Sequence, residues 1–277
     1  MQLTREFRQV GKASDLLQAL GNLWGQDKLV EQRLKRWRLA TIIVLIAMIA
    51  GWILLKPLGA VALVAAVVCG WHWVHYHRLN LEDRRILTPL KFLEVIQADI
   101  LPRDPVRLKV SFEDFRKHGR VLEQTGGRFS SVRRSKYEDT WLEVEGWLAE
   151  KTRFQVTVSQ RVSLSEKSKR KYTKTKLRVR EEVSLALRPN PKLYAALENL
   201  PQLIPSEWEV AGLRVSSVRV SGRHVLLEAQ GGLYTKLSGR SSAESGTEAL
   251  VNGNTLLTLM AAVYDRLGQC RAQAAAS

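Results

Sequence analysis

Hydrophobic positions gather first in one long stretch near the N-terminus. From Leu39 to Tyr76 almost every residue is apolar, and only the sequence KPLG at 56–59 interrupts the stretch. A charge, a proline and a glycine in succession favour a break between two helices. The pattern therefore predicts helices over 39–55 and 58–76, each about 26–29 Å long, which is close to the ~30 Å thickness of a hydrocarbon core.

The flanks of this stretch predict an orientation in a membrane. Basic residues precede the first helix at 33–38 and follow the second at 78–85, whereas the connecting turn has only Lys56. Because positive flanks stay inside, both termini are expected in the cytoplasm of an integral membrane protein, in a bacterial inner membrane or its equivalent. A cleaved signal peptide and a pair of buried core helices are the alternatives. The aromatic residues expected at the membrane interface are Trp37, Trp52, Trp71, Trp73 and Tyr76.

Apolar residues also recur at helical spacing over residues 14–37. They predict that 1–38 is a cytoplasmic N-terminal amphipathic segment. Two arrangements stay open for it: a helix in the headgroup layer, or a helix packed on the folded domain that follows.

Alternation of apolar and polar residues predicts a long β-hairpin in the second half of the chain. Apolar residues occupy every second position over 154–164, broken only by Gln160, and again over 177–187, broken only by Glu181. A strand at 141–148 precedes the hairpin with the same alternation. The three segments are typical of an antiparallel meander.

Helices and shorter strands are predicted around this hairpin. One helix begins at Thr88-Pro89 and another covers Asn254–Gln269, with strands near 106–112, 213–220 and 224–229. The predicted fold class is an α+β membrane protein, in which an N-terminal transmembrane helical hairpin at 39–77 precedes a cytoplasmic antiparallel-β-rich domain at 78–277. The alternative division of that domain is two lobes, 78–188 and 189–277.

Composition indicates the sign of the charge on the expected partner. The 277 residues include 43 Lys and Arg against 27 Asp and Glu, a formal charge of +16. Residues 103–180 hold 21 basic and 10 acidic side chains, so this segment alone has an excess of 11. The 45% of hydrophobic residues excludes a wholly disordered chain, and two cysteines exclude a disulfide scaffold. Anionic partners are expected.

The basic residues of the hairpin and of the loop before it are the candidate anion-binding site. Their expected ligand is an anionic lipid, an acidic protein or a small anionic ligand. A solvated loop that prevents aggregation and a nucleic-acid site, in which Phe129, Tyr137 and Tyr172 stack on bases, are the alternatives. The candidates are Arg128, Arg133, Arg134, Lys136, Lys167, Lys169, Arg170, Lys171, Lys174 and Lys176.

Signatures of catalysis are absent from the sequence. It contains no GxxxxGK[ST], GxGxxG, HExxH or GxSxG motif. Glu181-Glu182 is expected to form cross-strand ion pairs, and His72 with His75 is better explained by interfacial rings than by a metal. We therefore expect a protein without enzymatic activity, cofactor or metal.

Two functions follow from this organisation. The first is a membrane-anchored adaptor, assembly or sensor protein whose basic hairpin binds an anionic partner. The layout also resembles that of two-span effectors of bacterial nucleotide-signalling defence systems. This resemblance covers organisation only and implies a ligand-gated effector whose helices oligomerise or perturb the bilayer on binding a nucleotide-like ligand. The expected partners are the lipid bilayer and an anionic lipid or acidic protein, with homo-oligomers as a further possibility.

Overall fold

The computed structural model describes residues 5–54, 56–79, 81–126, 131–169, 172–194, 197–205, 207–238, 243–245 and 250–276. Its contacts divide into two compact units. The helical unit contains Ala19–Asp83, and the sheet unit contains Thr4–Gln18 together with Arg84–Ser277.

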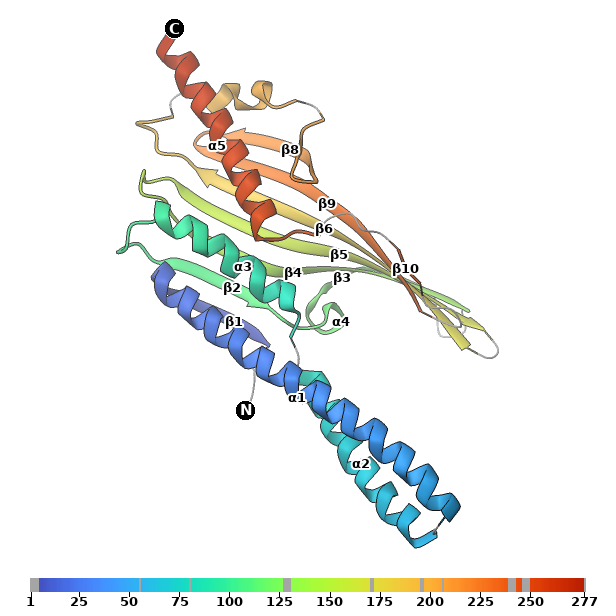
Figure 1. Cartoon of the computed structure of the whole chain (residues 1–277). Coiled ribbons are helices and arrows are strands. Elements are labelled where there is room, and N and C mark those ends of the chain that lie inside the picture. Colours follow the sequence, from blue (N-terminus) through green and yellow to red (C-terminus); the bar gives the residue numbers. More distant parts are fainter. Residues whose placement is uncertain are drawn as a thin grey trace. The chain divides into compact units, whose positions relative to one another are not determined.

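The helical unit consists of most of α1 (Ala13–Leu54) and of α2 (Lys56–Leu79), which run side by side in Figure 1. Helix α1 ends at Leu54 and α2 begins at Lys56, so the KPLG sequence forms the first turn of α2, close to the predicted break. The rings of Trp37 and His72 stack with their centroids 4.4 Å apart. Near the other end, the buried Asp27 carboxylate accepts a hydrogen bond from the Leu81 N–H at 2.8 Å.

The prediction that these helices span a membrane is wrong. Within the described ranges, no helix is both long enough and apolar enough to cross one. The apolar residues 39–54 are only the last part of α1, whose earlier turns carry charged side chains such as Lys28, Glu31 and Lys35 in ion pairs. The membrane-protein fold class, the integral-membrane localisation and the cytoplasmic assignment of both termini are corrected with it.

A single ten-stranded sheet dominates the second unit, and every strand pair in it is antiparallel. The strand order is β1-β2-β4-β5-β6-β9-β8-β7, with β3 paired to β4 and β10 paired to β9. The antiparallel, β-rich character that the alternation predicts is confirmed. The strands are β1 (Glu6–Gly11), β2 (Val106–Ser111), β3 (Arg120–Thr125), β4 (Val132–Trp147), β5 (Arg153–Lys169), β6 (Tyr172–Arg188), β7 (Glu209–Val210), β8 (Leu213–Ser221), β9 (His224–Ser238) and β10 (Ala243–Ser245).

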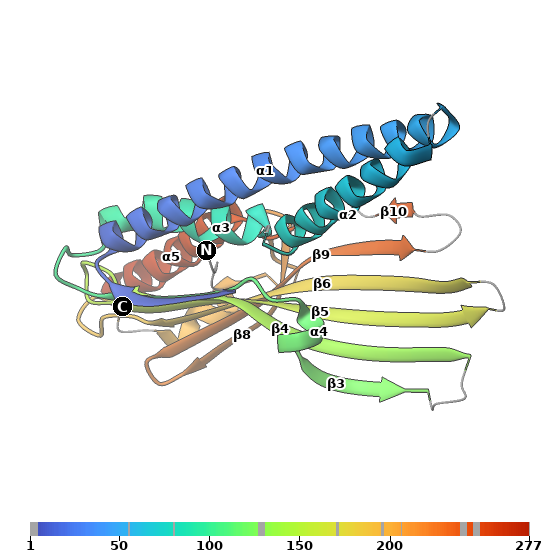
Figure 2. The same ribbon diagram turned by 90° about the horizontal axis from the view of Figure 1, so that it is seen from below.

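Helices α3 (Asp83–Ile96) and α5 (Gly253–Ala276) lie across one face of this sheet, as Figures 1 and 2 show. Phe92 of α3 packs edge-on against Phe154 of β5 with ring centroids 6.3 Å apart, and both side chains are buried. A Cβ at Gly253 would lie 2.8 Å from the Thr88 carbonyl oxygen, so glycine permits α5 to begin against α3. The remaining helical segments are α4 (Phe115–His118) and two 3-10 turns, Gln97–Asp99 and Leu197–Leu203.

Several elements differ from the sequence prediction. Strand β4 begins at Val132, so the basic residues 133–136 that were predicted to lie in a loop belong to a strand, and β9 continues to Ser238. Helix α3 begins one turn earlier than Thr88-Pro89 predicts, because Arg84 and Arg85 in its first turn are fixed by carboxylates of the sheet. Strand β1 was not predicted, because EFRQVG shows no alternation and its side chains are mostly exposed. Pairing with β2 makes it a strand.

Alternation within the central strands assigns each side chain to a face. On β5 the even-numbered residues 154–164 are buried on the face that α3 and α5 cover, here called the covered face. Odd-numbered neighbours such as Ser159, Arg161 and Ser163 point to the opposite side, here called the open face. The same three strands β4, β5 and β6 therefore carry two chemically separate surfaces.

Candidate functional site

On the open face, small side chains of β5 are flanked by cations from both neighbouring strands. Lys136 of β4 lies opposite Ser163, which lies opposite Arg178 of β6. The next row repeats this arrangement with Arg134, Ser165 and Lys176. The cations of β4 and of β6 therefore form two parallel rows, one on each side of the serines of β5. Adjacent strands are about 4.8 Å apart. We call this surface the basic trough; it consists of Arg134, Lys136, Arg161, Ser163, Ser165, Lys176, Arg178 and Arg180.

The basic trough is hollowed at its inner end. A cavity of about 270 Å³ lies there, and its charged walls come from Lys136, Arg161, Arg178, Arg180 and Glu182. Leu122 and Leu233 close its sides. Four cations therefore converge on a space that contains a single carboxylate.

Most cations in this part of the open face lack a counter-ion. Lys136 is 2.6 Å from the Glu123 carboxylate, and Arg161 is 3.2 Å from Glu182. Cations farther along the open face, such as Lys109 and Arg153, pair with Glu143 and Glu145, but within the described residues the remaining cations around the trough make no ion pair. These unpaired cations are Arg134, Lys167, Lys174, Lys176, Arg178 and Arg180.

Strand register also places like charges directly opposite one another. Arg161 faces Arg180, and Lys167 faces Lys174 across the β5–β6 ladder. Like charges in such positions destabilise a sheet. An anionic partner would relieve this repulsion.

The carboxyl of Glu182 is partly buried beside the trough, and this position changes its pKa. Burial raises the pKa of its carboxyl above the ordinary value, and this effect exceeds the opposing influence of Arg161. Protonation of Glu182 leaves the hollow more positive.

The structure brings together five of the residues predicted from the sequence. Arg133 lies on the other face of β4, opposite Glu166, and does not join them. Lys169 is the last residue of β5, and Arg128, Arg170 and Lys171 lie outside the described residues. The five on the open face are Arg134, Lys136, Lys167, Lys174 and Lys176.

Some residues of the trough were not among the predicted site residues. Arg178 and Arg180 belong to the basic excess of the sequence, but their place in the site depends on their cross-strand neighbours. Arg161 and Ser163 give no signal of their own. The available signal was spacing, since both continue the open-face positions at every second residue of β5.

Of the three aromatic residues expected to stack on bases, Tyr137 is among the residues that line the hollow of the trough. Tyr137 lies opposite Val162 of the covered face, and its ring meets Phe115 edge-on at 5.4 Å. Phe129 lies outside the described residues, and the side chain of Tyr172 is not described. The described residues therefore do not bring the three expected aromatic side chains together as a stacking surface.

The covered face of the same strands carries a row of buried polar side chains. Gln160 of β5 lies opposite both Asp139 of β4 and Glu181 of β6, and all three are buried. Gln160 donates a hydrogen bond to Asp139 Oδ2 at 2.8 Å. The two breaks in the apolar alternation are thus direct neighbours in one polar row.

Helix α3 supplies the positive charge for this row. Arg84 forms an ion pair with Glu181, whose second oxygen accepts the Val251 N–H at 2.6 Å. Arg85 approaches Asp139 at 3.4 Å and donates to the Ser111 carbonyl at 2.8 Å. The expected cross-strand ion pair is confirmed for Glu182 with Arg161 but is wrong for Glu181, which pairs with a helix.

Metal binding and interfacial roles gain no support. Among the described residues, no three His, Cys, Asp or Glu side chains are placed to hold a metal ion. Trp52, Trp71 and Trp73 are exposed, whereas Trp37 and Tyr76 lie beside His72. With the spanning helices corrected, the interfacial interpretation of these five aromatic residues loses its basis.

The comparisons with known proteins add no function. No protein-family model matches this chain, and no curated protein or solved structure shows significant similarity to it.

Proposed function

We propose that this chain is a non-enzymatic binding protein whose basic trough holds an extended acidic segment of a partner protein. The observation that carries the proposal is the set of unpaired cations on β4, β5 and β6, two of which, Lys167 and Lys174, face each other without a counter-ion. If this surface bound no ligand, replacing either lysine by a neutral residue would stabilise the sheet at no cost to function.

The geometry of the trough suits an extended chain. Cations on β6 recur at every second residue, about 6.8 Å apart, which is also the repeat of side chains on one side of an extended peptide. A carboxylate at every second position of the partner would therefore meet Lys176, Arg178 and Arg180 in turn. The hydroxyls of Ser163 and Ser165 leave room for its backbone and offer further hydrogen bonds.

Three other anions fit less well. Single-stranded nucleic acid would need free aromatic rings for its bases to stack on, whereas the Tyr137 ring at the hollow already packs edge-on against Phe115. A planar layer of headgroups would contact the rims of the trough and leave its serine floor empty. A nucleotide-like ligand would need more space than the 270 Å³ hollow, because small-molecule pockets enclose about 300–1,000 Å³.

The test is binding of a fluorescent twelve-residue poly-glutamate peptide to the full chain. Arg178→Glu should weaken binding about tenfold or more, because it replaces an attraction by a repulsion. The matched control is Arg188→Glu, an equally exposed arginine on the open face of the same strand, about 34 Å away. Equal losses in the two variants would show that only net charge matters and would overturn the proposal.

A second variant separates the trough from its charge. Ser163→Tyr fills the floor between Lys136 and Arg178 without changing any charge. It should reduce peptide binding about tenfold and leave the thermal unfolding midpoint within a few degrees. If oligothymidylate or phosphatidylserine vesicles bind more tightly than the peptide and are unaffected by Ser163→Tyr, the acidic-protein proposal is wrong.

A further inference from the structure

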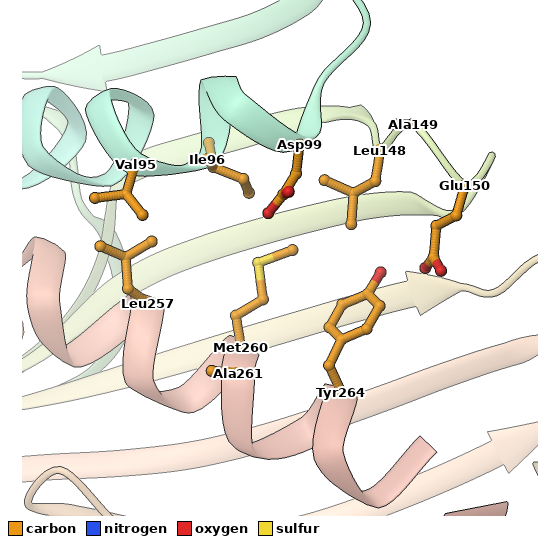
Figure 3. Close-up of a pocket in the computed structure, with 10 residues that line it drawn as sticks. All are labelled: Val95, Ile96, Asp99, Leu148, Ala149, Glu150, Leu257, Met260, Ala261 and Tyr264. Carbon is orange, nitrogen blue, oxygen red and sulfur yellow. The ribbon is translucent and has the colours of Figure 1, made fainter. Parts of the chain in front are cut away.

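A second cavity lies in the sheet unit, on the covered side and away from the basic trough. It has a volume of about 580 Å³ and lies between α3, α5 and the turn that joins β4 to β5. This volume falls within the range of small-molecule sites. Figure 3 shows its lining.

Most of the cavity wall is apolar. Ile96, Leu148 and Met260 form its buried base, and Val95 and Leu257 face each other at one end (Figure 3). Val95 is 55% exposed, so part of this apolar wall meets solvent. A ligand with an apolar body would cover it.

The opposite end of the cavity is polar and acidic. Asp99 directs its carboxylate into the space, and the Tyr264 hydroxyl points toward Glu150 in Figure 3. Glu150 accepts hydrogen bonds from Thr152 at 2.8 Å and from Tyr194 at 3.0 Å, both neutral donors. Neither Glu150 nor Asp99 has a cationic partner within the described ranges, in a chain whose formal charge is +16.

The Tyr264 hydroxyl is the least satisfied group of the cavity. It is buried and lies near the side chains of Glu150 and Thr152, but it makes no hydrogen bond of good geometry to a described residue. A phenol can accept one hydrogen bond and donate another, and a carboxylate with two bonds retains about two lone pairs. An ammonium group placed between Tyr264 and Glu150 would donate to both.

We propose that this cavity binds an amphiphilic organic cation, with its alkyl or aryl body on the apolar wall and its ammonium group between Glu150, Asp99 and Tyr264. The apolar wall and the two unpaired carboxylates together specify the ligand, since a neutral apolar molecule leaves the carboxylates unused and an anion is repelled by them. The inference is independent of the basic trough.

Octylammonium chloride is the probe, with octanol and octanoate as ligands of equal chain length. Isothermal titration of the full chain should show octylammonium binding about tenfold or more tightly than octanol, and no octanoate binding. Equal affinities for octanol and octylammonium would show that the cavity binds apolar chains without recognising the ammonium group, and would overturn the proposal. Octanoate binding would contradict the proposal outright.

Variants assign the binding to this cavity. Glu150→Gln should weaken octylammonium about tenfold while leaving octanol unchanged, because it removes the charge and keeps the side-chain shape. Asp265→Asn, on an exposed turn of the same helix, is the control and should change neither ligand. Ala261→Phe fills the mouth from an exposed helical position and should abolish binding of both. Unchanged octylammonium binding in both Glu150→Gln and Ala261→Phe overturns the proposal.

Discussion

Strands β4, β5 and β6 use charge in opposite ways on their two faces. On the covered face, Asp139 and Glu181 are buried and each meets an arginine of α3. In the basic trough on the open face, cations outnumber carboxylates, and within the described residues only Lys136 and Arg161 form ion pairs. Charge on the covered face holds a helix in place, whereas charge on the open face is left for another molecule. Adjacent residues of one strand should therefore respond to mutation in different assays.

The largest expected effect comes from Glu181. Glu181→Ala removes the buried carboxylate that pairs with the Arg84 guanidinium and accepts the Val251 N–H. Breaking a buried ion pair costs about 3–5 kcal/mol in free energy of unfolding, measured by urea denaturation. Affinity for an acidic peptide should be unchanged in the folded protein.

The neighbouring residue provides the control. Glu182→Ala acts on the open face, where burial already disfavours the ionised carboxylate, and should change stability by less than about 1 kcal/mol. It should strengthen peptide binding by removing a negative charge from the hollow. If the two alanine variants lose equal stability, the contrast between the faces is false.

Lys167→Glu should show stability and binding moving in opposite directions. The new carboxylate would face Lys174 and replace a repulsion with an attraction, a gain of about 0.2–1 kcal/mol. The same change should weaken acidic-peptide binding. Lys192→Glu, at an exposed turn, is the charge-matched control for both measurements. A less stable Lys167→Glu protein would contradict the interpretation of the opposed lysines.

Mild acid should act through Glu182. Because burial raises its pKa above 4.5, the folded state holds this proton more tightly than the unfolded chain does. The resulting stability is fully present below the unfolded pKa and is lost as the pH rises through the folded pKa. Glu182→Gln should flatten this stability trend relative to the wild type, and parallel stability curves for the two proteins would rule out this origin.

The smallest effect is expected at Lys136 and Glu123, an exposed pair 2.6 Å apart. A double-mutant cycle with alanine at each position should give a coupling of only about 0.2–1 kcal/mol. Binding should respond in opposite directions, weaker in Lys136→Ala and stronger in Glu123→Ala. A coupling as large as the cost of Glu181→Ala would remove the distinction between exposed and buried charge.

Alternation was sufficient to predict β5 and β6 and the faces of their side chains. It could not explain why Gln160 and Glu181 interrupt the apolar positions, because the reason is their register with each other and with Asp139. The pairing of β4 with β5 shifts by one residue between Thr140 and Leu142, so the odd-numbered Asp139 and the even-numbered Leu142 lie on the same covered face. Simple alternation along β4 therefore assigns Asp139 to the wrong face.

Distance along the chain explains the other errors. Arg84 and Arg85 follow an apolar stretch and were therefore interpreted as a membrane flank, but their partners Glu181 and Asp139 lie 97 and 54 residues away. The basic residues of the trough could be listed from composition, yet their arrangement around Ser163 depends on the pairing of three strands. The cavity on the covered side is lined by α3, α5 and the β4–β5 turn, and no local sequence pattern indicates that these three segments lie together.

The position of β1 in the sheet has a consequence for the order of folding during synthesis. Its residue Glu6 pairs with Ser111, so after β1 is synthesised about a hundred further residues must follow before it can join β2. At about 5–20 residues per second, this delay lasts roughly 5–20 s. Closure of so long a loop also places the pairing among the late folding events. The polar, mostly exposed sequence EFRQVG is suited to such a delay, because it offers little apolar surface to other nascent chains.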